Sequence, residues 1–265
     1  MDRENSQPRP VTTTQTAVGI IDFLKRTDGA SIAEVAEQFD VARSTAHRHL
    51  RTLAGEGWAT RNESEGTFEV SLNVFHIGAT VRKENLVYQF AKDRVDELAD
   101  RTGERAWCIV EEGGRGIHLY GASNSQVNTY ARVGTRTYLH QHAAGKSILA
   151  FRPRKEVSAI VAEHGLEAIT GQTITEEEEL FEELEQVSEM GYAFNREESF
   201  RGLHAVGVPI CDDNDYALGA ISVSGPANRL KGEILESQLP ETLLEIANEI
   251  EINISNAAAE QLADE

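Results

Sequence analysis

The stretch Val41-Ala-Arg-Ser-Thr-Ala-His-Arg-His-Leu-Arg-Thr-Leu53 contains no Asp or Glu, although acids outnumber bases 44 to 25 in the chain. A helix over this stretch turns about 100° per residue and separates two faces. The apolar face holds Ala46, Leu50 and Leu53. The other face holds Arg43, Ser44, His47, Arg48 and Arg51. One face can pack on a core while the other donates to phosphates and base edges, which predicts the recognition helix of a DNA-binding domain.

Three helices and a small hairpin are expected around this stretch. Residues 12–26 carry apolar side chains at helical spacing, and the threonines at 12–14 are possible N-caps. Ser31-Ile-Ala-Glu34 matches a capping box that opens a second helix. Residues 58–60 and 67–70 have the composition of two short strands. This order predicts a winged helix-turn-helix domain over residues 1–72.

Residues 73–101 are expected to be mostly helical and to form a linker that also faces a second subunit. One face of this segment is apolar and holds Val87, Phe90, Ala91, Val95 and Leu98. An ordinary surface helix of the following domain is the alternative. The pattern does not separate these two interpretations.

Residues 102–265 are expected to form a second domain that mixes strands and helices. Short β-branched and aromatic runs predict strands at 105–112, 116–122, 127–133, 192–195, 203–211 and 217–224. Helices are expected at 142–151, 153–164 and 239–262, and a capping box at Thr175-Glu-Glu-Glu178 should open an acidic helix that ends at Gly191. The irregular alternation favours an α+β fold over a doubly wound one.

The charge of the chain is unevenly distributed. Residues 1–61 contain 8 basic and 8 acidic side chains, whereas residues 62–265 contain 17 and 36, so the net charge of −19 lies in the second part. With 19 Arg and 6 Lys, this composition suits a salt-rich cytoplasm, and we hypothesise a halophilic protein. No apolar run is long enough for a membrane helix, and we expect a cytoplasmic location without membrane contact. Cys108 and Cys211 are expected to be buried and reduced.

The chain resembles the IclR-type transcription regulators over nearly its whole length. In the N-terminal part the resemblance rests on Ser31-Ile-Ala-Glu-Val-Ala36 and on the stretch that begins at Arg43. In the C-terminal part it rests on three motifs: Leu139-His-Gln-His-Ala-Ala-Gly-Lys-Ser-Ile-Leu-Ala150, Gly191-Tyr-Ala-Phe-Asn-Arg-Glu-Glu198 and Ser222-Val-Ser-Gly-Pro226. The three C-terminal motifs, in this order and spacing, are the more specific part.

The resemblance implies a homodimer, or a dimer of dimers, that binds double-stranded DNA at a palindromic operator. It also implies a GAF-like C-terminal domain that senses a small-molecule effector. The family's ligand pocket corresponds here to Ala143, Ala144, Gly145, Asn195, Leu203, Ala205 and Ser222. Asn195 stands where an Asp is usual and Ala205 where a Cys is common, and His204 is unusual at its position. The missing carboxylate implies that the effector differs from those of other members.

The residue types indicate what each site can bind. Arg43, Arg48 and Arg51, with His47 on the same face, can contact phosphates or guanine, and Ser44 and Thr45 can donate to phosphate near the helix start. Backbone N–H groups of Ala143-Ala-Gly145 at a helix start suit an anion, and Ser222 and Asn195 can add hydrogen bonds. The effector is therefore expected to be an organic acid, a sugar acid or an aromatic compound. Small residues that merely permit tight packing are the alternative.

Other functions are less well supported. His140, His142, His204 and Cys211 match no zinc-binding spacing, so no metal or other cofactor is expected. Gly113-Gly-Arg-Gly116 lacks the Lys-Ser/Thr pair of a phosphate loop. An enzyme would need a nucleophile such as Cys211 or Ser222 with His204 as its base, and we expect no catalytic residue. A sensor that acts through protein contacts instead of DNA is a second alternative. Our hypothesis is that effector binding changes the spacing of two recognition helices through the linker.

Overall fold

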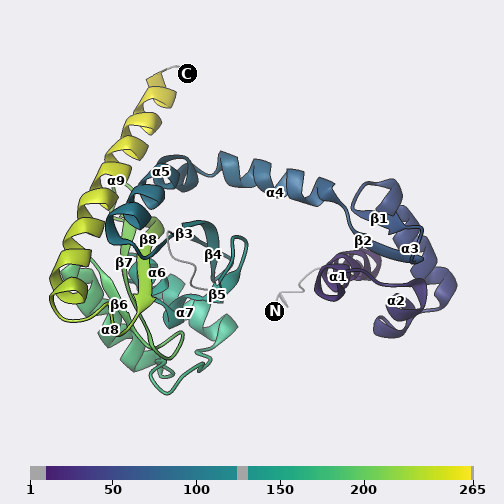
Figure 1. The fold of residues 1–265 in the computed structure, drawn as a ribbon, viewed down its shortest axis with the longest axis horizontal. Helices are drawn as coiled ribbons and strands as arrows, with labels where there is room; N and C mark the ends of the chain where they lie inside the picture. Colours follow the sequence, from purple (N-terminus) through teal and green to yellow (C-terminus); the bar gives the residue numbers. More distant parts are fainter. Residues whose placement is uncertain (1–9, 124–130, 264–265) are drawn as a thin grey trace, which may run out of the picture. The chain divides into compact units, whose positions relative to one another are not determined.

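The computed structural model describes residues 10–123 and 131–263, which form two compact units, residues 1–81 and 82–265 (Figure 1). The first unit contains the helices α1 (Thr12–Thr27), α2 (Ile32–Gln38) and α3 (Arg43–Gly55) and the hairpin of β1 (Ala59–Asn62) and β2 (Thr67–Val70). Ile20, Leu24, Val35, Leu50 and Phe68 form its core. The winged helix-turn-helix fold predicted from the sequence is confirmed.

Of the two N-terminal caps predicted in the first unit, the one at α2 is formed and the one at α1 is not. The Ser31 side chain and the Glu34 side chain exchange hydrogen bonds at the start of α2, as the capping box requires. α1, in contrast, is preceded by Val11, and no side chain caps it. The expectation that a threonine at 12–14 caps α1 is therefore wrong, because the helix already includes all three threonines.

Two helices connect the first unit to the sheet of the second, and they differ in burial. α4 (Leu72–Glu84) has no buried residue. α5 (Leu86–Thr102) buries Val87, Ala91, Val95 and Leu98 in the main core of the second unit. The apolar face that the sequence analysis assigned to the linker is thus covered by the chain's own sheet, because α5 packs on β3 and α9.

The second unit is built on a six-stranded antiparallel sheet with the order β5-β4-β3-β8-β7-β6. The strands are β3 (Arg105–Glu112), β4 (Arg115–Ala122), β5 (Arg136–Tyr138), β6 (Ala193–Arg196), β7 (Leu203–Cys211) and β8 (Ala217–Pro226). α5 and α9 (Leu239–Ala263) cover one face, and a π-helical turn, Ile234–Gln238, precedes α9. α6 (Ala143–Ala150), α7 (Arg154–His164) and α8 (Glu177–Met190) pack on the other face. This is the predicted α+β arrangement.

Two local predictions in this unit need correction. The strand expected at 127–133 falls partly outside the described residues, and its described part, 131–133, is not a strand. Arg132 and Thr135 instead close a turn through Gly134, whose φ is +83°, and the strand follows at Arg136. The capping box at Thr175 is not formed, because α8 begins at Glu177 after Glu176 without a side-chain cap. Glutamates 177–179 lie in its first turn, where negative charge is favourable. No helix among the described residues is long and apolar enough to span a membrane.

Candidate DNA-binding face and effector cavity

α3 presents one buried and one exposed face, as the sequence predicts. Ala46, Leu50 and Leu53 are buried in the core of the first unit, and α2 packs beside α3. The five side chains of the opposite face are exposed: Arg43, Ser44, His47, Arg48 and Arg51. Thr45 is half-buried. The six residues expected to bind DNA therefore lie on one helix, and five of them are accessible.

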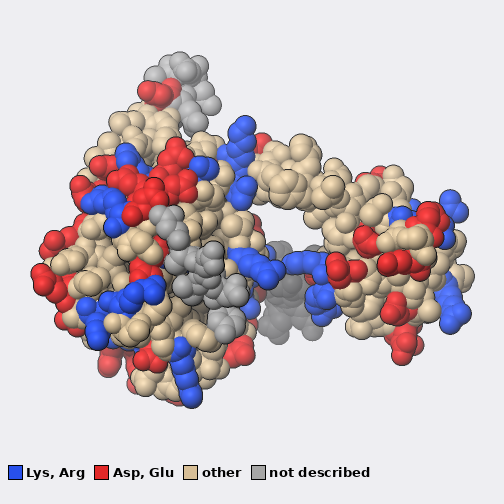
Figure 2. All heavy atoms as spheres, in the orientation of Figure 1, with Lys and Arg blue, Asp and Glu red and all other residues tan. Residues whose placement is uncertain are grey.

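No acidic side chain among the described residues pairs with the arginines of this face. None of Arg43, Arg48 and Arg51 forms an ion pair with a described residue, whereas arginines of the second unit commonly do. Arg94 contacts Glu249 at 2.8 Å and Arg101 contacts Glu245 at 3.4 Å, both between α5 and α9. In Figure 2, acidic side chains gather on the second unit around these helices. The acid-free face of α3 is thus available to an anionic partner.

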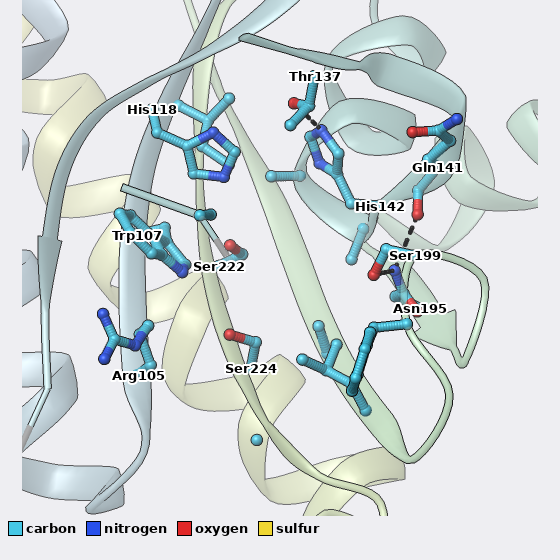
Figure 3. A pocket seen from close by; sticks show the side chains of 18 of the residues that line it. Arg105, Trp107, His118, Thr137, Gln141, His142, Asn195, Ser199, Ser222 and Ser224 are labelled. Atoms are coloured by element: carbon cyan, nitrogen blue, oxygen red, sulfur yellow. Dashed lines mark hydrogen bonds between the residues drawn. The ribbon is translucent and has the colours of Figure 1, made fainter. Parts of the chain in front are cut away.

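A cavity of about 490 Å³ lies between the sheet of the second unit and the start of α6 (Figure 3). Six of the seven residues expected to bind an effector line it: Ala143, Ala144, Asn195, Leu203, Ala205 and Ser222. Gly145 does not line it. A Cβ on Gly145 would lie 2.1 Å from the Leu139 carbonyl oxygen, so this glycine permits the close approach of the preceding turn.

The strand register explains how residues far apart in the sequence reach the cavity. Asn195 pairs with Ala205, Ala205 with Ser224, and Ser224 with Arg105, so these four form one row across the sheet. Gly207, Ser222 and Trp107 form the next row. A Cβ on Gly207 would lie 2.4 Å from the Ala144 nitrogen, so the absence of a side chain there lets α6 begin directly against β7.

The start of α6 is only partly open to an anion. The Gly145 N–H donates to Nδ1 of His142, the N-cap residue, at 3.0 Å. The N–H groups of Ala143 and Ala144 have no hydrogen-bond acceptor among the described residues. The expectation that the whole Ala143-Ala-Gly145 turn offers its N–H groups is therefore wrong for Gly145, because the imidazole caps it.

Asn195 is engaged in holding the cavity wall. Its side-chain N donates to the Gln141 carbonyl at 3.0 Å and to Ser199 Oγ at 2.8 Å, and its oxygen accepts from the Glu198 N–H at 3.1 Å. The side chain is fully buried. Both amide hydrogens are used within the protein, so Asn195 orients the turn that follows β6, where Ser199 and Phe200 line the cavity.

A buried ion pair network supports the same turn from behind. Lys146 on α6 is 1% exposed, and its Nζ lies 2.7 Å from Glu183 on α8 and 2.9 Å from Glu198. Burial raises the pKa of Glu198, and the Lys146 charge opposes that rise. The network connects α8 to α6 and to the turn after β6, and the last two line the cavity.

Most of the other lining residues were not expected from the sequence, and three of them are examined further: Arg105, Trp107 and His118. The first two belong to the strand predicted at 105–112, but its residue types do not indicate which face of the strand lines a cavity. His118 reaches the cavity through a β-bulge, because the register of β3 and β4 shifts between Cys108 and Ile109. The residue types of the two strands did not reveal where this shift occurs.

Two charged side chains line the cavity, Glu104 and Arg105. Glu104 accepts two hydrogen bonds from Arg229, at 2.6 and 2.7 Å, which compensate its charge. The Arg105 guanidinium lies 5.5 Å from the Trp107 ring centre, and burial lowers the pKa of this group. Among the described lining residues, Arg105 is the one Arg or Lys.

The residues considered for catalysis or metal binding are separated. His204 Nδ1 lies 2.7 Å from the Leu230 carbonyl oxygen, on the opposite face of β7 from the cavity. The Cys211 thiol has its pKa raised to about 12 by burial, and Cys108 is fully buried. Among the described residues no group of three or more His, Cys, Asp or Glu side chains could hold a metal ion.

Both units match one family of known proteins. Residues 13–63 match the IclR helix-turn-helix domain, and residues 79–252 match the domain described as bacterial transcriptional regulator IclR C-terminal. The chain is 32% identical to a probable HTH-type transcriptional regulator, ArcR, of Halobacterium salinarum, over 96% of this chain and 97% of that protein. It is 29% identical to the HTH-type transcriptional repressor AllR of Escherichia coli, over 83% and 82%.

A solved structure agrees with the sequence matches. The crystal structure of the Thermotoga maritima IclR superposes with a TM-score of 0.77 at 31% identity, covering 92% of this chain and 98% of that one. The relatives named above are transcriptional regulators. The chain therefore belongs to the IclR family of transcriptional regulators, with a helix-turn-helix DNA-binding domain and a C-terminal effector-binding domain.

Proposed function

We propose that the chain binds a palindromic operator as a homodimer or dimer of dimers through α3, and that a small organic acid in the cavity changes its operator affinity. The observation that carries this proposal is the exposed, acid-free face of α3 in a protein of net charge −19. An overall negative charge opposes binding to DNA, so a local exception of this kind needs a specific anionic partner.

The roles proposed for the α3 residues follow from their positions. Ser44 and Thr45 lie in the first turn, where hydroxyl and backbone donors can meet a phosphate. Arg43 and His47 flank the exposed face and contact the DNA backbone. Arg48 lies at its centre and reads a base edge, for which a bidentate guanine contact contributes about 1–3 kcal/mol of discrimination.

The exposed apolar residues of α4 support a homodimer. Leu72, Phe75, Ile77 and Val81 are between 38% and 85% exposed, on a helix with no buried residue. Such a concentration of exposed apolar side chains is unfavourable in water and marks an interaction surface. A second copy of α4 would cover them and would set the separation of two α3 helices, which must fit half-sites about one helical turn apart or a multiple of it.

The cavity favours an organic acid among the three effector classes expected. Arg105 supplies a positive charge, and the N–H groups of Ala143 and Ala144 at the start of α6 supply two donors. The remaining lining is largely apolar, with Trp107, Ile109 and Leu203. A carboxylate attached to a small carbon skeleton matches this lining. An effector that binds one arrangement of α4 and α5 more tightly than another would favour that arrangement, and operator affinity would change with it.

The test of the DNA-binding proposal is a gel-shift titration of Arg48→Ala against operator fragments recovered by genome-wide footprinting. We expect operator affinity to fall about tenfold to hundredfold, because one base contact is lost. Thr52→Ala, an exposed change on the same helix, is the matched control and should bind as the unmodified protein does. Size-exclusion chromatography should give the same oligomer for all three proteins. Unchanged operator affinity of Arg48→Ala would remove α3 from the DNA site.

A further inference from the structure

Two histidines border the cavity, and they use their ring nitrogens differently. Nδ1 of His142 accepts the Gly145 N–H, so the ring hydrogen is on Nε2, which donates to Thr137 Oγ1 at 2.8 Å. Thr137 in turn lies 3.3 Å from the Gly116 carbonyl oxygen and donates to it. Both nitrogens of His142 are therefore occupied within the protein, and this histidine has nothing left to offer a ligand.

His118 has one nitrogen occupied and one directed at the cavity. Its Nδ1 lies 3.3 Å from the Thr135 carbonyl oxygen, which can only accept, so Nδ1 carries the hydrogen. In a neutral ring, Nε2 then holds a lone pair, and it has no hydrogen-bond partner among the described residues. The residue is 5% exposed, and burial lowers the pKa of its ring to about 4, so the neutral form prevails at pH 7.

The orientation of His118 is fixed by the fold. The bulge in the β3–β4 pairing places it opposite Ile109, on the cavity face of the sheet, whereas Ile117 and Leu119 pack toward α5 and α9. The ring meets Trp107 edge to face, with centroids 4.8 Å apart and planes at 86° (Figure 3). A bulge next to a binding site commonly serves to re-aim one side chain. Here it delivers a hydrogen-bond acceptor into an apolar cavity.

We propose that Nε2 of His118 accepts a hydrogen bond from a hydroxyl group of the effector, so the cavity selects a hydroxylated organic acid over the same acid without its hydroxyl. This inference rests on the proposed effector function of the cavity. A buried acceptor that a ligand leaves unsatisfied weakens binding, so the site discriminates against the analogue that lacks the donor.

The sheet register also indicates where the hydroxyl lies relative to the acid group. The start of α6 sits against Gly207, in the row of Trp107, and His118 belongs to the row of Ile109, two residues further along β3. Two strand residues span roughly 7 Å along the strand. In the sheet, β3 and β8 also lie between β7, which carries Gly207, and β4, which carries His118. The preferred ligand therefore carries its hydroxyl several bonds from the carboxylate, in contrast to an α-hydroxy acid.

The chain offers a local reporter for this test. It has two tryptophans, Trp58 in the first unit and Trp107 in the cavity, so Trp58→Phe leaves Trp107 as the sole indole. Fluorescence titrations of this full-length protein would use four matched pairs: 4-hydroxybenzoate and benzoate, 4-hydroxybutyrate and butyrate, 3-hydroxybutyrate and butyrate, and glycolate and acetate. We expect at least one of the first three pairs to show about a tenfold preference for the hydroxylated member. We expect no preference in the glycolate pair.

Two variants in the Trp58→Phe background assign that preference to His118. His118→Phe keeps a ring against Trp107 but removes the acceptor, and it should bind both members of a pair equally. His118→Gln keeps an acceptor and should retain part of the preference, and thermal unfolding verifies that both variants fold. A hydroxyl preference that survives in His118→Phe, or equal affinities for every pair in the Trp58→Phe protein, would overturn the role of His118 while leaving the effector site standing. Binding of no acid at all would overturn the effector site itself and this inference with it.

Discussion

The face of α3 and the cavity of the second unit are built in opposite ways. The α3 face consists of exposed side chains on one continuous helix, and none of its arginines depends on another described residue for its position. The cavity is assembled from neighbouring rows of the sheet and the start of α6. Asn195, Lys146 and His142 hold these parts together through hydrogen bonds inside the protein. A substitution on α3 should therefore affect DNA binding alone, whereas a substitution behind the cavity should affect stability as well.

The largest effect is expected from Lys146→Met, which removes the buried cation and leaves Glu198 and Glu183 without their partner. We expect the free energy of unfolding of the second unit to fall by about 3–5 kcal/mol, because a buried charge is left uncompensated. Chemical denaturation monitored by circular dichroism measures it. Adding Glu198→Gln should recover part of the loss. A loss below about 1 kcal/mol would show that the network does not hold the cavity wall.

A smaller effect is expected from Gly207→Ala. The added Cβ would meet the backbone of Ala143 and Ala144 at 2.4–2.7 Å, and backbone atoms cannot move aside as a flexible side chain can. We expect about 1–3 kcal/mol of destabilisation, as is typical of overpacking. Gly171→Ala, at an exposed glycine with open space around it, is the control and should change stability little. Equal stabilities of the two variants would contradict the close contact of α6 with β7.

The stability of the second unit should depend on pH because His118 is buried beside the cavity. Because the folded pKa of His118, about 4, lies below the unfolded value of about 6.5, the unfolded state binds a proton that the folded state does not. Stability from this group is complete above pH 6.5 and is lost as the pH falls toward 4, at up to ~1.4 kcal/mol per pH unit. His118→Phe should remove this part of the pH dependence, measured as the difference in unfolding free energy from the unmodified protein.

The smallest effect on stability is expected from Arg51→Ala. The side chain is exposed and has no ion-pair partner among the described residues, so the free energy of unfolding should change by less than about 0.5 kcal/mol. Its DNA binding should nevertheless change: the slope of log affinity against log salt concentration should shrink by about one, the value for one lost phosphate contact. An unchanged slope would place Arg51 away from the DNA backbone.

The same difference between the α3 face and the cavity explains which parts of each site could be predicted from the sequence. The exposed side chains of α3 were predicted from the sequence, because helical periodicity fixes which side chains share a face, and Thr45 alone of the six is half-buried. The lack of acids on this face is the basis of the DNA-binding role that we propose for it. For the cavity, six lining residues followed from a family resemblance, but their roles did not. Asn195 was expected to bind the effector; it lines the cavity, and both of its amide hydrogens are used within the protein.

The rest of the site could not be predicted because it depends on pairing between distant strands. His118 faces the cavity only through a bulge opposite Ile109, and Arg105 and Ser224 become neighbours only through the β3–β8 register. Local composition carries no information on either. The described part of the strand expected at 127–133 is not a strand for a related reason, since the hydrogen bonds of His118 with Gly134 and Thr135 make residues 132–135 a turn.

The central claim is that the cavity and the α3 face are linked in free energy, and reciprocity tests it most directly. The affinity of the Trp58→Phe protein for the best-binding acid would be measured through Trp107 fluorescence with and without saturating operator DNA. The account predicts that the operator changes acid affinity by the same factor by which the acid changes operator affinity in gel-shift titrations, about fivefold or more. An acid affinity that is identical with and without operator would contradict it.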